Sequence, residues 1–123
     1  MRSDDLYLAE ILDAADLIAR RIRDIDVVSW NADDEKRDAV LFRLMTIGEA
    51  ARSLSEAFRT SHDDLPWRRM IGFRNVVVHE YFAVDWATVW RIAHVEIPPL
   101  RERIHQVLEA EYPEGYELWR GED

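Results

Sequence analysis

One stretch of the chain gathers arginine, asparagine, histidine and tyrosine within eight positions, beside a run of three valines. It runs from Arg74 and Asn75 through His79 to Tyr81, in an Arg-x4-His-x-Tyr spacing. An imidazole can take or give a proton near neutral pH, and a guanidinium can stabilise charge that grows on phosphate oxygens. Held close together, the two groups are the minimum needed for metal-free cleavage of a phosphodiester. The alternative interpretation is a buried helix with a capping histidine.

On a regular helix, five positions turn through about 140°, so Arg74 and His79 do not share one narrow stripe. Asn75 and His79 are four positions apart and lie on the same face. The arginine side chain is long enough to swing toward that face, especially if the helix unwinds near His79. Tyr81 can reach back if the chain turns there. We therefore expect these residues to line one concavity.

The composition restricts the function classes. The chain has 123 residues, which fits one domain, and 48% of them are hydrophobic, including five tryptophans, so it can bury a core. It has no cysteine, so disulfides and thiolate metal sites are excluded. No apolar run approaches the ~20 residues that cross a bilayer, and the N-terminus lacks the apolar core of a signal peptide. We expect a soluble, cytoplasmic protein with no membrane contact.

The net charge is −9, and acidic residues crowd the C-terminal tail. This argues against broad, non-specific nucleic-acid binding, which needs a basic face. It does not exclude a small basic cleft, because Leu65 to His79 holds three arginines and no acid. The acidic balance also suits a protein that is held by a basic partner.

The elements that must position these residues are helices. Apolar residues recur at steps of three and four, and only four glycines and four prolines interrupt them. The spacing predicts helices over 4–25, 34–58, 66–79 and 86–109, with Asp85 capping the last and Pro98-Pro99 kinking it. We therefore predict an all-α, up-and-down four-helix bundle over residues 1–110. Residues 111–123 are expected to form an acidic, aromatic tail.

Three apolar seams are expected to form the core. They comprise Leu8, Ile11, Ala15, Ile18, Ile22 and Ile25 in the first helix; Val40, Leu44, Ile47, Ala51, Leu54 and Phe58 in the second; and Val89, Ala93, Ile97, Leu100, Ile104 and Val107 in the last. Gly48 interrupts the second helix at a cost of up to about 1 kcal/mol relative to alanine. We expect a close approach to compensate, made by a neighbouring helix or by the same helix of a second subunit.

These residues carry a resemblance to a known family. The stretch from Arg74 to Tyr81 resembles the Arg-x4-His-x-Tyr signature of the HepT-like toxins of the HEPN superfamily. The flanking segments resemble the family too: Ile47-Gly48-Glu49-Ala50-Ala51, Leu65-Pro66-Trp67, Ile71-Gly72-Phe73 and Tyr81-Phe82-Ala83-Val84-Asp85. The resemblance extends from the first helix to about Leu108.

The resemblance implies a helical bundle that forms a homodimer, with the signature residues of both subunits facing a shared groove. It implies a metal-independent endoribonuclease that needs no cofactor and acts as the toxin of a toxin–antitoxin pair. The implied partner is an MntA-type minimal nucleotidyltransferase, which silences the toxin by adenylylating the signature tyrosine. Arg74 and His79 would then be the catalytic pair, Asn75 a supporting residue and Tyr81 the modification target.

The chemistry of RNA agrees with this implication. The 2′-OH is an internal nucleophile, His79 can take its proton, and Arg74 can donate to the non-bridging oxygens. We expect a 2′,3′-cyclic phosphate and a 5′-OH as products, from tRNA or mRNA. Arg68 and Arg69 are the best candidates to hold the RNA backbone outside this pair.

Two other functions remain open. A non-catalytic HEPN dimer that docks a nucleotidyltransferase or binds a nucleotide would have the same bundle. Separately, the alternative to Tyr81 as a modification target is a core aromatic residue whose hydroxyl is hydrogen bonded. A metal-dependent bundle enzyme is the third possibility, because Glu102 and His105 resemble half of a di-iron motif. No second copy of that motif is present in the sequence, so we predict no metal site. Trp67, Trp86 and Trp90 can stack bases, but we expect them in the core or an interface.

Overall fold

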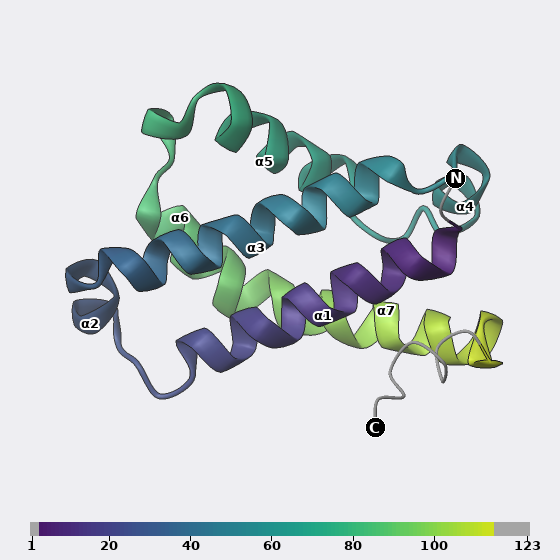
Figure 1. Cartoon of the computed structure of the whole chain (residues 1–123), viewed down its shortest axis with the longest axis horizontal. Helices are drawn as coiled ribbons and strands as arrows, with labels where there is room; N and C mark the ends of the chain where they lie inside the picture. Colours follow the sequence, from purple (N-terminus) through teal and green to yellow (C-terminus); the bar gives the residue numbers. More distant parts are fainter. Residues whose placement is uncertain (1–2, 115–123) are drawn as a thin grey trace.

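The structure is a computed structural model that describes residues 3–114, and it is helical with no strand over that range. Its long elements alternate in direction (Figure 1). They are α1 (Asp4–Ile22), α3 (Asp34–Ser53), α5 (Trp67–His79) and a continuous run of α6 (Trp86–Arg91), η2 (Ile92–Glu96) and α7 (Ile97–Glu111). This confirms the predicted all-α, up-and-down bundle. Over the same range, no helix is both long enough and apolar enough to cross a membrane.

The order of the helices in space follows from their contacts. Helix α3 packs between α1 and α5, and α1 packs between α3 and α7. The predicted seams form the core: all their residues are buried except Ile25, which is partly buried and packs against it. Trp30 is buried in the core, and Trp86 and Trp90 pack against it, with the Trp30 ring 5.3 Å from that of Trp90. The expectation that the tryptophans serve packing is therefore confirmed for Trp86 and Trp90, and also for Trp67, which is buried.

The first helix is shorter than predicted, and a short helix follows it. Helix α1 ends at Ile22 because Arg23 is extended and Asp24 has a φ of 62°, which a right-handed helix cannot include. The expected link contains α2 (Val27–Ala32), where Asp26 accepts a hydrogen bond from the backbone N–H of Ser29 at 2.8 Å. A single capped turn is too short to show a helical period, so the sequence did not predict it.

The second predicted helix is divided into two. Helix α3 ends at Ser53, and α4 (Glu56–Ser61) begins after Ser55, whose hydroxyl accepts from the N–H of Phe58. The prediction of one helix over 34–58 was therefore wrong. The break is fixed from outside the segment, because the Asp4 carboxylate of α1 accepts from both the N–H and the hydroxyl of Ser55. A tertiary contact of this kind does not appear in the local periodicity.

A π-helical segment interrupts the last predicted helix. The segment η2 has π-helical hydrogen bonding, and Pro98 and Pro99, which have no N–H to donate, follow it directly as the second and third residues of α7. Asp85 caps α6 as predicted, accepting from the N–H of Ala87 at 3.1 Å. The expected domain boundary at 110 falls at the end of α7, and Tyr112 packs against the core. The rest of the predicted tail, residues 115–123, lies outside the described residues.

Helix α5 lies very close to α3 at Gly48. A β-carbon built on Gly48 would lie 2.6 Å from the carbonyl oxygen of Met70 and would overlap the β-carbon of Arg74. The close approach that we expected at Gly48 is therefore confirmed, and the neighbour is α5 of the same chain.

Candidate active site

Arg74 is fixed at the seam between α5 and α3. Its Nε donates to Glu49 Oε2 at 2.7 Å, and its Nη2 lies 2.5 Å from the same oxygen. Its Nη1 donates to Oδ1 of Asn75 at 2.9 Å. The side chain is only 15% exposed, so the guanidinium is held in one orientation. These contacts leave one N–H on each terminal nitrogen for a further acceptor.

Asn75 and His79 lie on the outer face of α5, and both are exposed. The hydrogen bond from Arg74 to Asn75 shows that the guanidinium turns toward this face, as the length of the side chain predicted. Helix α5 ends at His79, which also agrees with the sequence, because three β-branched residues weaken the last turn. The structure therefore joins Arg74 directly to Asn75 and places His79 one turn further along the same face.

Tyr81 points to α3 and not to His79. It lies in the single turn η1 (Tyr81–Ala83), and its hydroxyl donates to Oδ1 of Asp38 at 3.2 Å. This hydrogen bond raises the pKa of Tyr81 above its ordinary value. The side chain is 43% exposed, so the alternative of Tyr81 as a core aromatic residue was wrong.

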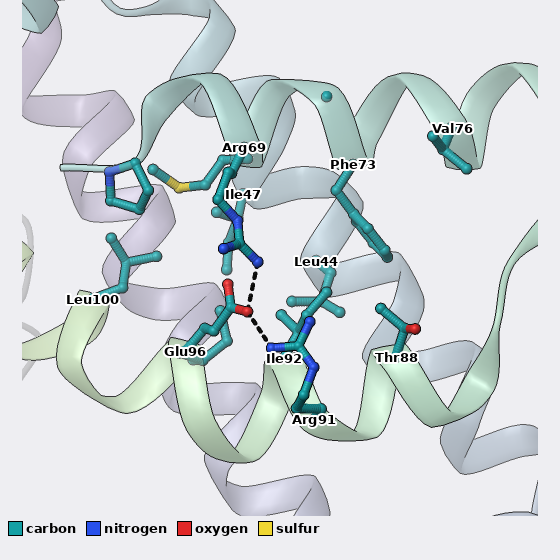
Figure 2. Close-up of a pocket in the computed structure, with 14 residues that line it drawn as sticks. Leu44, Ile47, Arg69, Phe73, Val76, Thr88, Arg91, Ile92, Glu96 and Leu100 are labelled. Atoms are coloured by element: carbon teal, nitrogen blue, oxygen red, sulfur yellow. Dashed lines mark hydrogen bonds and ion pairs between the residues drawn. The ribbon is translucent and has the colours of Figure 1, made fainter.

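Arg68 and Arg69 differ in their partners, because only Arg69 forms an ion pair among residues 3–114. Arg69 donates to Oε2 of Glu96 at 2.6 Å, and Arg91 donates to the same oxygen at 2.6 Å. Figure 2 shows this cluster spanning a groove between α5 and the α6–η2–α7 run, with Leu44 and Ile47 of α3 among its lining residues. The groove has a volume of about 290 Å³. Arg68 lines a second hollow, between α4 and α5, to which Arg69 and Asn75 also contribute.

Large apolar side chains are exposed on α3, α5 and η1. Phe42 of α3 is 51% exposed, Val78 of α5 is 45% exposed, and Phe82 is 98% exposed with its ring packed edge-on against Tyr81. Because Tyr81 is hydrogen bonded to Asp38, one turn before Phe42, η1 lies against the same part of α3. We call Phe42, Val78, Tyr81 and Phe82 the apolar patch. Exposed clusters of this kind mark interaction sites in soluble proteins.

Two carboxylates of the site were missed by sequence reasoning. Glu49 and Asp38 hold Arg74 and Tyr81, and both lie on α3, 25 and 43 positions from their partners. The only available signal was the position of Glu49 directly after Gly48, the point of close approach. The structure describes no group of three or more His, Asp and Glu side chains within 3–114 that could hold a metal ion. The two members of the half di-iron motif lie on α7, where His105 is 3.4 Å from Glu109.

Comparisons with known proteins identify relatives over most of the chain. A family model described as "Ribonuclease HepT-like" matches residues 11–107. The chain is 32% identical over 101 residues to "Putative RNase MJ1380" of Methanocaldococcus jannaschii, covering 82% of this chain and 93% of the relative. It is 31% identical over 111 residues to "Putative RNase TTE0752" of Caldanaerobacter subterraneus subsp. tengcongensis, covering 90% and 99%.

A third relative is "Probable ribonuclease HepT" of Thermococcus cleftensis. The identity is 32% over 106 residues, which is 86% of this chain and 96% of the relative. No solved structure gives a significant match to this chain.

Proposed function

Because the chain belongs to the HepT-like ribonuclease family, we propose that it is a cytoplasmic, metal-independent endoribonuclease and the toxin of a toxin–antitoxin pair. One observation supports this most directly: the Arg74 guanidinium is fixed by Glu49 and Asn75 beside the face that carries His79. Ordered donors next to a titratable group are the arrangement that phosphodiester cleavage requires.

In the proposed reaction the RNA supplies its own nucleophile. His79 takes the proton of a 2′-OH, the 2′ oxygen bonds to the adjacent phosphorus, and the bond from phosphorus to the 5′ oxygen breaks. The 5′ oxygen takes up a proton, so the products are a 2′,3′-cyclic phosphate and a 5′-OH. The free N–H groups of Arg74 donate to the non-bridging oxygens, whose charge grows in the transition state.

A second copy of the chain completes the proposed site. A single histidine cannot act as base and acid in the same step, whereas a homodimer can place two His79 residues in one groove. The apolar patch supports this assembly, because a second copy would remove Phe42, Val78 and Phe82 from water. Mixed dimers that carry one wild-type and one His79→Ala subunit test it. Full activity of such dimers at every cleavage position would contradict the shared groove.

An MntA-type nucleotidyltransferase is the proposed antitoxin, and Tyr81 is its proposed target. In the transfer, the Tyr81 oxygen bonds to the α-phosphorus of ATP and pyrophosphate leaves. The exposure of Tyr81 and its hydrogen bond to Asp38 support this role, because the carboxylate can take the phenolic proton. The added adenylate would place bulk and negative charge beside the site.

A second candidate function is a non-catalytic dimer that docks the nucleotidyltransferase or binds a nucleotide. The ion pair between Arg74 and Glu49 favours it, because the carboxylate offsets much of the positive charge that a phosphate would meet. The net charge of −9 favours it in the same way. Activity measurements separate the two candidates.

The decisive experiment is cleavage of bulk tRNA and of a transcribed mRNA by the purified protein in excess EDTA. We expect cleavage with 2′,3′-cyclic phosphate ends, detected by mass spectrometry. His79→Ala and Arg74→Ala should each lower the rate at least about 100-fold. His94→Ala is the matched control, because His94 is an exposed histidine whose ring contacts the carbonyl of Trp90 on its own helix.

Growth on induction gives the same comparison in cells. We expect that induction of the wild-type protein inhibits growth and that induction of His79→Ala does not. Growth inhibition that survives both His79→Ala and Arg74→Ala would remove the ribonuclease proposal. Absence of RNA cleavage by the wild type would favour the docking function.

A further inference from the structure

The outer face of α5 carries a continuous stripe of exposed residues that ends at His79. Arg68, Gly72, Asn75 and His79 follow one another at steps of four, three and four, and all four are exposed. This spacing places them on one face of the helix. The stripe is about 16 Å long, which at about 3.4 Å per stacked nucleotide corresponds to about five nucleotides. The proposed reaction uses only its His79 end.

The two helical glycines of this region differ in what surrounds them. Gly48 is explained by the packing of α5 against it, whereas a β-carbon added to Gly72 would have no atom within 4 Å. Glycine inside a helix destabilises it relative to alanine. Nothing in the described part of the chain compensates for that loss at Gly72. We take this as a sign that a molecule outside this fold passes close to the helix backbone there.

A hollow runs along the stripe from Arg68 past Gly72 to Asn75. It has a volume of about 910 Å³ and is lined by residues of α4, of the following connection and of α5, with Arg59, Arg68 and Asn75 among them. Arg69 is held by Glu96, but no ion pair within residues 3–114 involves Arg59 or Arg68. The Nε of Arg59 is buried without a hydrogen-bond partner. Two arginines are therefore available to an anionic ligand, although Glu56 and Asp63 also line the hollow.

We propose that an RNA strand held at Arg74 and His79 continues along this stripe toward the N-terminus of α5. Its sugar–phosphate backbone crosses Gly72, and its next phosphates bind Arg68 and Arg59 in the hollow. The inference rests on the proposed ribonuclease function and assigns Arg59 and Gly72 to substrate positioning.

The polarity of the stripe favours RNA over a second copy of the chain as the occupant. Arg68, Asn75 and His79 are polar or charged, and guanidinium groups recognise phosphates through planar, paired donors. Val78, which belongs to the apolar patch, is turned about 120° away from Gly72 around the helix. A second copy that covers the apolar patch would therefore leave the stripe open to substrate.

Substrates of two lengths test the role of the arginines. A dinucleotide reaches only the reacting centre at Arg74 and His79, whereas a 12-nucleotide single strand also reaches Arg59 and Arg68. For the double variant Arg59→Gln, Arg68→Gln we expect a KM for the 12-mer raised about tenfold, with kcat and the dinucleotide rate within twofold of wild type. The slope of log K for the 12-mer against log salt should fall by about 0.7 for each arginine removed. Arg20→Gln, which removes an exposed charge from α1, is the matched control.

The single variant Arg68→Gln guards against misfolding, because Arg68 is exposed whereas part of Arg59 is buried. It should show about a threefold increase in KM for the 12-mer by itself. If both variants bind and cleave the 12-mer as wild type does, the inference is overturned while the ribonuclease function stands. If wild type cleaves neither substrate, the ribonuclease function itself fails.

Gly72→Ala tests the path of the strand. Alanine favours the helix, so we expect Tm to rise by about 3 °C while the kcat/KM for the 12-mer falls at least tenfold. The oligomeric state, measured by sedimentation velocity, should not change. A variant that dissociates would show that a second subunit covers Gly72, and one that cleaves the 12-mer normally would show that nothing passes there; either result overturns the inference.

Discussion

Gly48 of α3 faces the β-carbon of Arg74 on α5, and a methyl group on Gly48 would occupy the same space as that β-carbon. The absence of a side chain at this position lets the two helices approach. The carboxylate of Glu49, the next residue along α3, can then accept a hydrogen bond from Nε of Arg74 and form an ion pair with its Nη2. The position of the proposed catalytic Arg74 therefore depends on Gly48, which has no side chain that could take part in the reaction.

Gly48→Ala should destabilise the fold and the site together. The gain in helix propensity is up to about 1 kcal/mol, whereas overpacking against the Met70 carbonyl and Arg74 costs about 3 kcal/mol. We expect the free energy of unfolding to fall by about 2 kcal/mol in urea denaturation, and RNA cleavage to fall with it. Gly72→Ala is the control for stability only, because its β-carbon meets open space and should raise the free energy of unfolding. Equal changes in the free energy of unfolding for the two substitutions would contradict the role of Gly48.

Arg74→Lys should inactivate the proposed enzyme although it keeps the charge. A lysine ammonium is a point donor and cannot reproduce the planar set of bonds to Glu49 and Asn75. We expect kcat to fall about 100-fold, measured on a labelled RNA. Arg69→Lys makes the same exchange five positions earlier on α5, where the partner is Glu96, and should leave kcat within threefold. Retained activity in Arg74→Lys would show that only the positive charge matters.

Asp38→Asn should slow the proposed modification of Tyr81. The carboxylate accepts the phenolic hydrogen bond at 3.2 Å, so it is placed to take the proton when the oxygen attacks. We expect adenylylation by the partner nucleotidyltransferase to fall about tenfold, followed by intact-protein mass spectrometry. Tyr81→Phe should abolish it, and Asp13→Asn on the exposed side of α1 should not change it. A mass increase that persists in Tyr81→Phe would place the modification elsewhere.

His62 should make the stability depend on pH. Burial opposes its protonation, but the hydrogen bond to Glu111 at 2.7 Å, the Phe58 carbonyl and nearby negative charges raise its pKa above 6.5. A raised pKa in the folded state stabilises the protein fully below the unfolded pKa of 6.5. That stabilisation is lost as the pH rises through the folded pKa.

Glu111→Gln removes the main group that favours the charged imidazole. It should therefore lower the free energy of unfolding by about 1 kcal/mol at pH 5.5 and by much less at pH 8.5. Thermal unfolding at the two pH values measures the difference, with Glu35→Gln in the exposed first turn of α3 as the control. If Glu111→Gln lowers the free energy of unfolding equally at both pH values, the cause is lost packing and not the charge of His62.

The core of the bundle followed from the sequence because helix burial is periodic. Seam residues such as Leu8, Leu44 and Ile104 recur every three or four positions, and each is buried as predicted. The start of α6 was predicted from its local cap at Asp85. The break between α3 and α4 was missed, because the carboxylate that holds Ser55 comes from Asp4 in another helix.

The sequence by itself determined the identities and the order of the groups in the site: an arginine, an asparagine on the face of the histidine, and a helix that ends at His79. Only the tertiary structure decided their partners. Arg74 reaches Glu49, Tyr81 turns to Asp38, and Arg69 crosses to Glu96. The physical reason is that helical periodicity fixes the face on which a side chain lies. The packing of one helix on another decides which opposite charge that face meets.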